Sequence, residues 1–270
     1  MKNIVKSLLV GTLSVAALAV CAEDKTILNL TFDEGFDSGV YEFGKRGSAA
    51  LVPAEDGKGK VLAPVAAGKK GPAGIILSGD AAPEFTSEAF TLSFKFKYTG
   101  KPVAELKKGV YAWMYDCRYR GKSAKGGMSI NLSANPKATS MNISIGCKDG
   151  KTAGGSFRVP GAVDGKWHEV VITVAPGKLS FSFDGKVQNR VMLGTPAPAS
   201  QRLTIGDCVG SSYSPFYGLI DDVKLTVPAA PAAAAAPAAP DMQIRLTTVS
   251  VQFLLSASAC SLWQSSLAAL

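Results

Sequence analysis

The sequence lacks most of the residue patterns on which hydrolases and transferases depend. Its one histidine, His168, would have to serve any Ser-His-Asp triad, and it follows Trp167 inside an expected strand. The chain contains no Gly-x-Ser-x-Gly turn, no phosphate-binding P-loop and no histidine-based metal spacing. We therefore interpret His168 as a structural residue of its strand.

Cysteines are few, and their spacing does not indicate a metal site. No two of the five have C-x-x-C spacing, which argues against a thiolate zinc site or a thioredoxin-type redox motif. An exported chain can oxidise its cysteines. We expect a disulfide between two of Cys117, Cys147 and Cys208, and the sequence alone does not choose the pair.

The N-terminus has the pattern of a secretory signal. Lys2 and Lys6 precede an apolar run over residues 8–20, which is shorter than the ~20 residues of a spanning helix. Small residues around position 22 predict cleavage before Glu23, so residues 1–22 are expected to be removed. The segment ending at Cys21 also resembles a lipoprotein box, which is the alternative. Either route places the protein outside the cytoplasm: secreted, periplasmic or at the cell surface.

The net charge of +8 is spread along the chain rather than concentrated. A nucleic-acid-binding protein gathers its basic residues on one stripe or helix, so nucleic acid is not an expected partner. The scattered lysines indicate either a solvated basic surface or a surface that weakly attracts anionic polysaccharide.

Apolar and polar residues alternate with a period of two through most of the chain, which is typical of half-buried strands. The clearest runs lie at residues 28–32, 90–98, 128–133, 141–145 and 179–183. Residues 170–174 are apolar on both faces except Thr173, which indicates a central strand. Asp-Gly pairs at 149–150, 164–165 and 184–185 predict tight turns. The sequence therefore predicts an all-β, two-sheet antiparallel sandwich.

Composition changes after Val227. Residues 228–240 are almost entirely Ala and Pro and predict an extended linker. The tail, residues 241–270, carries no Gly and no Lys and has no charge from Thr247 onward. It is interpreted as a membrane-seeking tail, a disordered end or a non-native segment. The globular domain is expected to span residues 23–227.

Six short motifs in order resemble a laminin-G-like jelly roll of the concanavalin A-like lectin/glucanase superfamily. They are Leu30-Thr31-Phe32-Asp33-Glu34-Gly35, Phe90-Thr91-Leu92-Ser93-Phe94, Gly165-Lys166-Trp167-His168-Glu169-Val170, Phe181-Ser182-Phe183-Asp184-Gly185-Lys186, Leu203-Thr204-Ile205-Gly206 and Gly218-Leu219-Ile220-Asp221-Asp222-Val223. The resemblance implies two antiparallel sheets and a role in carbohydrate or protein binding.

Some members of that superfamily are glycosidases, which carry carboxylates at alternate positions of one strand. We find no such strand, and Asp221 and Asp222 are adjacent rather than alternate. The leading hypothesis is a non-catalytic carbohydrate-binding or adhesion domain of an exported bacterial protein. A structural or protein-interaction domain of the cell envelope is the alternative, followed by a glycan-active hydrolase. The expected partner is a glycan or cell-surface polysaccharide, or another envelope protein.

Two aromatic-rich segments could stack sugar rings, with arginines to bind hydroxyls. The candidate ligand-binding residues are Tyr115, Arg118, Tyr119, Arg120, Tyr213 and Phe216. The alternative is that these rings close the ends of the core. Membrane association is expected only if Cys21 is lipidated or the tail anchors the chain.

Acidic residues at the two ends of the domain suggest a structural calcium ion. Strand alternation places Asp221 with Val223 and Leu225, where an unpaired carboxylate is costly. The first and last strands of such sandwiches are commonly neighbours, and calcium takes ~6–8 oxygen ligands. The candidate ligands are Asp33, Glu34, Asp37 and Asp221. The alternative is that Asp221 accepts backbone N–H groups or pairs with a Lys or Arg.

Overall fold

The computed structural model describes residues 24–65, 72–101, 109–118, 126–135, 137–209 and 214–229. The strands are β1 (Lys25–Leu30), β2 (Phe43–Lys45), β3 (Ala50–Pro53), β4 (Lys60–Ala63), β5 (Ile75–Leu77), β6 (Phe90–Tyr98), β7 (Val110–Asp116), β8 (Met128–Asn135), β9 (Ala138–Gly146), β10 (Thr152–Arg158), β11 (Trp167–Ala175), β12 (Lys178–Phe183), β13 (Lys186–Val191), β14 (Thr204–Ile205) and β15 (Gly218–Val227). A short 3-10 helix covers Pro83–Phe85. Within these residues, no helix is long and apolar enough to span a membrane.

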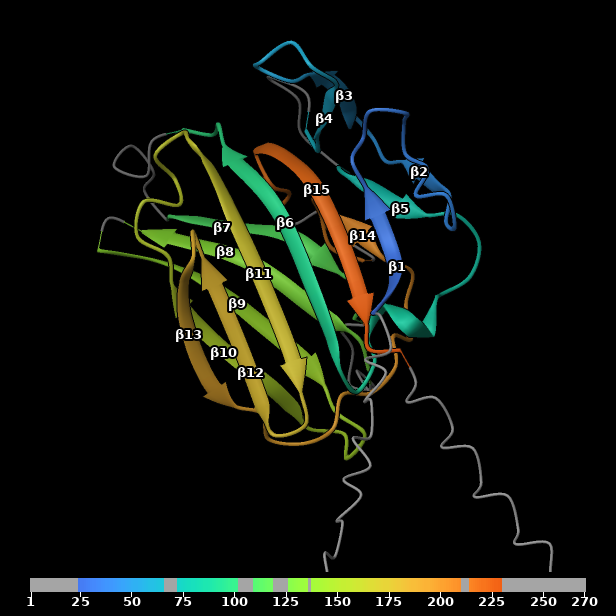
Figure 1. Ribbon diagram of the computed structural model, residues 1–270. Helices are drawn as coiled ribbons and strands as arrows, with labels where there is room; N and C mark the ends of the chain where they lie inside the picture. The colour runs from blue at the N-terminus through green and yellow to red at the C-terminus, as the bar shows by residue number, and fades with distance from the viewer. Residues whose placement is uncertain are drawn as a thin grey trace, which may run out of the picture. The chain divides into compact units, whose positions relative to one another are not determined.

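The strands form two antiparallel sheets, one stacked on the other (Figure 1). The eight-stranded sheet runs β13-β12-β11-β6-β15-β4-β3, with β1 also beside β15, and the seven-stranded sheet runs β10-β9-β8-β7-β14-β5-β2. The sandwich predicted from the alternating pattern is therefore confirmed.

The core lies between the sheets and is filled by every second residue of each strand. In β6 the buried positions are Phe90, Leu92, Phe94, Phe96 and Tyr98. Each fully buried large apolar side chain contributes about 1.5–3 kcal/mol, so this strand alone is a major source of stability. Strand β11 pairs with β6 on one side and β12 on the other, which confirms its predicted central position.

The predicted turns form where Asp-Gly pairs occur. Gly150, Gly165 and Gly185 have φ of 78°, 80° and 74°. Asp184 also has a positive φ, 48°, so the β12–β13 hairpin has two left-handed residues, as a type I′ turn requires.

Strand β15 brings the two ends of the domain together. One edge pairs with β6, and the other edge pairs with β4 at Ile220 and with β1 from Val223 onward. Figure 1 shows β1 and β15 side by side, which confirms that the first and last strands are neighbours.

The change of neighbour along β15 coincides with a β-bulge at Asp221, where Asp222 has φ of 50°. The extra residue reverses the alternation, so Ile220 points into the core before the bulge and Val223 after it. The prediction that Asp221 shares the apolar face of Val223 was wrong for this reason. Asp221 lies opposite Lys95 on the outer face, although it is half-buried.

The expected disulfide is absent from the described residues, and that prediction was wrong. Cys117 and Cys147 are buried free thiols, and Cys208 is bonded to neither of them. The Cys117 sulfur lies 3.3 Å from the backbone nitrogen of Met128 and 3.4 Å from Thr86 Oγ1. Burial raises the pKa of Cys117 to about 11, so this sulfur is a thiol inside the core.

Candidate functional site

The outer face of the seven-stranded sheet is polar. Strands β8 and β9 carry serines and asparagines on this side, with Ser129 opposite Ser144 and Asn131 opposite Asn142. The Asn142 Nδ2 donates a hydrogen bond of 2.9 Å to Asn131 Oδ1, which fixes the orientation of both amides. The alternating pattern predicted that Ser129 and Asn131 face water, which was wrong, since they are 4% and 3% exposed.

A pocket of about 400 Å³ is lined by β9 and β10 of this sheet together with the end of β13 of the other sheet and the residues after it. This volume is within the ~300–1,000 Å³ range of small-ligand sites. It is lined by Asn142, Ile143, Ser144, Thr152, Ala153, Gly154, Gly155, Val191 and Leu193. Hydroxyl and amide groups from β9 and β10 form one part of the lining, and the apolar side chains of Ile143, Ala153, Val191 and Leu193 form another. Val191 and Leu193 are 72% and 75% exposed, so this apolar part is accessible to a ligand.

Gly154 in β10 is required by the backbone that forms this pocket. Its φ is 118°, and a Cβ atom there would lie 2.1 Å from the carbonyl oxygen of Ile143. A side chain would therefore push β10 away from β9 and close or distort the pocket.

Arg118 extends from the end of β7 to the pocket. Its Nη2 donates a hydrogen bond to the hydroxyl of Thr152, which is a lining residue. The buried carboxylate of Asp116 holds the backbone at this point, because it accepts 3.1 Å and 2.8 Å hydrogen bonds from the N–H groups of Arg118 and Val209. Arg118, a predicted ligand-binding residue, is thus brought next to the polar lining.

The aromatic residues predicted to bind ligand are placed differently. Tyr115 and Phe216 are 1% and 0% exposed, and both belong to the core between the sheets. The Tyr115 hydroxyl donates a 3.3 Å hydrogen bond to the Phe85 carbonyl. Neither ring can stack on a ligand, so the alternative, that they close the core, is correct for both. Tyr119, Arg120 and Tyr213 lie outside the described residues.

Tyr111 is the accessible ring that sequence reasoning missed on this face. It lies opposite Ser133 of β8 and is 46% exposed. Its ring packs edge-on against buried Trp113, with centroids 5.4 Å apart. The alternating pattern of residues 110–113 could have indicated its outward direction.

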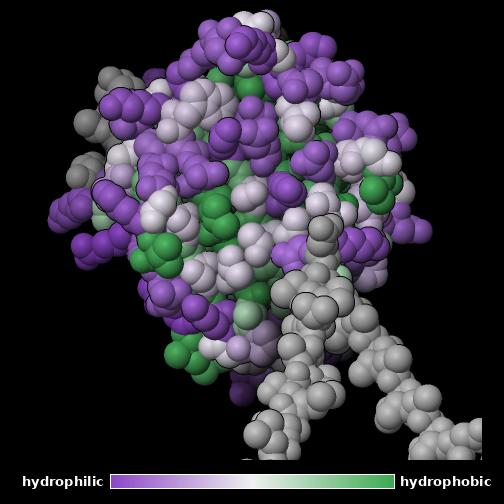
Figure 2. Space-filling view, in the orientation of Figure 1, coloured by the Kyte–Doolittle hydropathy of each residue, from purple (hydrophilic) through white to green (hydrophobic). Residues whose placement is uncertain are grey.

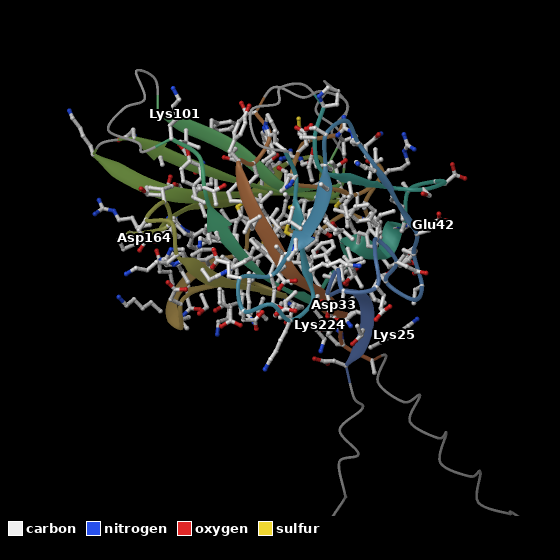
Figure 3. The ribbon with its side chains drawn as sticks, turned by 90° about the horizontal axis from the view of Figure 1, so that it is seen from above. Lys25, Asp33, Glu42, Lys101, Asp164 and Lys224 are labelled. Atoms are coloured by element: carbon white, nitrogen blue, oxygen red, sulfur yellow. The ribbon has the colours of Figure 1, made fainter. Side chains whose placement is uncertain are left out.

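The four predicted calcium ligands do not converge. Asp33, Glu34 and Asp37 are all exposed, and Figure 3 shows Asp33 below β15 and near β1. The Asp33 carboxylate accepts a 3.0 Å hydrogen bond from the Lys60 N–H, whereas Asp37 accepts 2.7 Å from the Gly39 N–H in its own turn. Among the described residues, no three His, Cys, Asp or Glu side chains form a group that could hold a metal ion.

Asp221 itself accepts a backbone hydrogen bond, which is the alternative to a metal. Its Oδ1 accepts 2.9 Å from the Asp222 N–H, and the Asp222 carboxylate pairs with Lys95 at 2.8 Å. Burial, with the Asp222 and Asp33 charges, raises the pKa of Asp221 to about 6, while the Asp222 N–H and Lys95 oppose the shift.

His168 is a structural residue, as expected. The imidazole is buried against Phe183, with ring centroids 5.0 Å apart, and both of its nitrogens face carboxylates. Nδ1 lies 2.8 Å from Asp184 and Nε2 lies 3.1 Å from Asp164. Figure 3 shows Asp164 on the side of the molecule away from Glu42.

These features define the class of the domain: a two-sheet antiparallel jelly roll with a pocket of mixed polar and apolar lining that includes residues of both sheets. The sequence model of the Concanavalin A-like lectin/glucanases superfamily matches residues 72–230, which is more than half of the chain. The chain therefore belongs to this superfamily. No curated protein matches the chain.

Solved structures of the same fold include two botulinum neurotoxin binding domains. The binding domain of Botulinum Neurotoxin DC, solved in complex with SialylT, aligns with a TM-score of 0.52 at 15% identity over 74% of this chain and 47% of that chain. The serotype G binding domain aligns with a TM-score of 0.54 at 11% identity over the same shares, 74% and 47%. The chain thus spans about half the length of these structures, and the likeness shows the fold alone.

Proposed function

We propose that this chain is a non-catalytic carbohydrate-binding domain of an exported bacterial protein, and that it binds sugar in the pocket between β9 and β10. The observation that carries the proposal is the composition of the lining. Asn142, Ser144 and Thr152 supply donors and acceptors for hydroxyls, while Leu193 supplies an apolar surface for the C–H face of a ring.

The fold supports this proposal by analogy. The Botulinum Neurotoxin DC binding domain, which has the same fold, carries SialylT in its complex. Function depends on the site rather than on the fold, so this likeness supports binding without identifying the sugar.

The charges around the pocket support binding without catalysis. Glycoside hydrolysis commonly uses a pair of Asp or Glu residues on either side of the bond. The described residues that line the pocket include no carboxylate. Asp116, the nearest acid along the chain to Arg118, is buried and accepts hydrogen bonds from two backbone N–H groups.

A glycan array tests the proposal directly. We expect the wild-type domain to bind a subset of glycans, and Asn142→Ala to weaken that binding about tenfold because one amide contact is lost. Asn29→Ala is the matched control, since Asn29 is an exposed strand residue of the other sheet. Absence of binding to every glycan, or wild-type binding by Asn142→Ala, would overturn the proposed function.

A second candidate, a protein-interaction domain of the envelope, is favoured by the edge strand β13. Val187 and Val191 are 59% and 72% exposed on this strand, and an exposed apolar edge is a common docking surface. The surface seen in Figure 2 is largely hydrophilic with separate hydrophobic patches. Val187→Lys should abolish capture of an envelope protein while leaving glycan binding unchanged if this function is correct.

Export is part of the proposal and concerns residues 1–23, which lie outside the described residues. Intact-mass analysis of secreted protein should give a chain that begins at Glu23. A lipidated Cys21 at the N-terminus would instead establish the lipoprotein route.

A further inference from the structure

The pocket between β9 and β10 has an arginine at one end of its polar lining. The Arg118 guanidinium donates to the Thr152 hydroxyl, and Arg118 is only partly exposed. A side chain fixed in this way is pre-organised, so little conformational entropy is lost when it binds an additional acceptor.

A second arginine lies beside the pocket. Arg190 of β13 is adjacent to Gly155, where a Cβ would be 3.1 Å from its Nε. Its Nη2 donates 2.6 Å to the Ser156 carbonyl, and its guanidinium carbon lies 4.9 Å from the centre of the Phe157 ring. Arg190 is exposed and adjoins the lining residues Val191 and Gly155, so it adds positive charge at the edge of the pocket.

One acidic group lies near the rim, and a lysine offsets it. Asp149 is 3.8 Å from the position that a Cβ of Gly194 would occupy, next to lining residue Leu193. Its carboxylate pairs with Lys151 at 3.6 Å. Because this pair is neutral and the lining has no carboxylate, Arg118 and Arg190 leave the pocket positive.

We propose that the pocket selects sugars that carry a carboxylate, and that Arg118 pairs with that carboxylate. This inference rests on the proposed carbohydrate-binding function and adds the chemical class of the sugar. Arginine presents parallel N–H donors that match the two oxygens of a carboxylate, whereas a neutral hydroxyl offers one oxygen and no charge. Asn142 and Ser144 then bind the ring hydroxyls, and Leu193 packs on the ring.

Uronic acids and sialic acids are common carbohydrates that carry such a group, and matched probes distinguish them. We would measure binding of oligogalacturonate against its methyl ester and of sialyllactose against lactose, by calorimetry at low and high salt, beside an array of neutral and sulfated glycans. The wild type should bind at least one acidic probe about tenfold more tightly than its neutral partner, with affinity falling as salt rises.

Variants assign the preference to Arg118. Arg118→Gln should remove the difference between acidic and neutral probes, and Arg118→Lys should retain only part of it because a lysine cannot bind both oxygens in parallel. Arg202→Gln is the control, since Arg202 is exposed and is not a lining residue. Melting curves establish that each variant is folded.

The outcomes separate this inference from the proposed function. Binding of neutral or only sulfated glycans, or an acidic preference unchanged in Arg118→Gln, would overturn the inference while the carbohydrate-binding function stands. Failure to bind any glycan would overturn both.

Discussion

The imidazole of His168 lies between the carboxylates of Asp164 and Asp184, with its Nδ1 2.8 Å from Asp184 Oδ2. This relationship connects the turn before β11 to the β12–β13 hairpin, because Asp184 also accepts a 2.9 Å hydrogen bond from the Glu169 N–H. The Lys166 N–H, with His168, lowers the pKa of Asp164. The ionised Asp164 carboxylate therefore stabilises the folded state above the ordinary carboxyl pKa. This stabilisation is lost as the pH falls through the lowered pKa that Asp164 has in the folded state.

We predict that His168→Ala lowers the free energy of unfolding by about 2–4 kcal/mol, since it removes a buried ring and takes one hydrogen-bond partner from each of two carboxylates. Urea unfolding at neutral pH measures this. His168→Gln, which keeps a side-chain donor, should lose less. If His168→Ala is as stable as the wild type, the contacts of His168 with Asp164 and Asp184 do not contribute to the free energy of unfolding.

Asp221 should make stability depend on pH. Its folded-state pKa of about 6 is above the ordinary 3.8, so the folded chain binds the proton more tightly. That contribution favours folding at about pH 4 and is lost as pH rises to about 6. Asp221→Asn should therefore gain up to about 1–2 kcal/mol relative to the wild type between pH 4 and pH 7, after allowance for solvent screening. Exposed Glu34→Gln should show no such gain.

The same variant tests the calcium prediction. If Asp221 binds calcium with Asp33, a chelator should lower the melting temperature and Asp221→Asn should be less stable than the wild type at neutral pH. The backbone hydrogen bond from Asp222 predicts instead that calcium and chelator give identical melting curves.

Cys117 should resist modification until the chain unfolds. Its thiol is buried and its pKa is raised to about 11, so the reactive thiolate is scarce at neutral pH. We predict that iodoacetamide labels Cys117 only in denaturant and that non-reducing peptide maps show no bond among Cys117, Cys147 and Cys208. A cross-linked peptide pair from native secreted protein would contradict the structure.

Gly154→Ala should destabilise the domain by about 1–3 kcal/mol and abolish ligand binding, because its Cβ would collide with the Ile143 carbonyl. Gly177→Ala is a matched control, since Gly177 also has a positive φ, 74°, but no atom within 4 Å of the added carbon. Both variants carry backbone strain, so the difference between their unfolding energies measures the collision.

Sequence patterns predicted the sandwich because a strand with one face in the core alternates apolar and polar residues. They predicted the tight turns because glycine readily adopts the positive φ that these turns require. They failed at Asp221, where one extra residue in a bulge reverses the alternation, and a bulge has no reliable signature in a single sequence. They also failed for Tyr115, which continues β7 as a core residue rather than beginning a loop.

The pocket itself could be predicted only in part. Arg118 was identified from its charge, whereas the fold brings Leu193, which follows β13, beside Asn142 and Thr152 of the β9–β10 hairpin. Alternation shows that a residue faces outward, but it does not show which outward residues of different strands are neighbours.

The location of the bound sugar is the most direct test of this account. Backbone amide chemical shifts of the domain would be followed by NMR during titration with a glycan that the array identifies. We predict that the largest changes fall in β9 around Asn142, in β10 around Thr152 and at Leu193. Changes confined to other parts of the described chain, such as β1 or the Asp33 turn, with those three regions unaffected, would contradict the proposal that this pocket is the binding site.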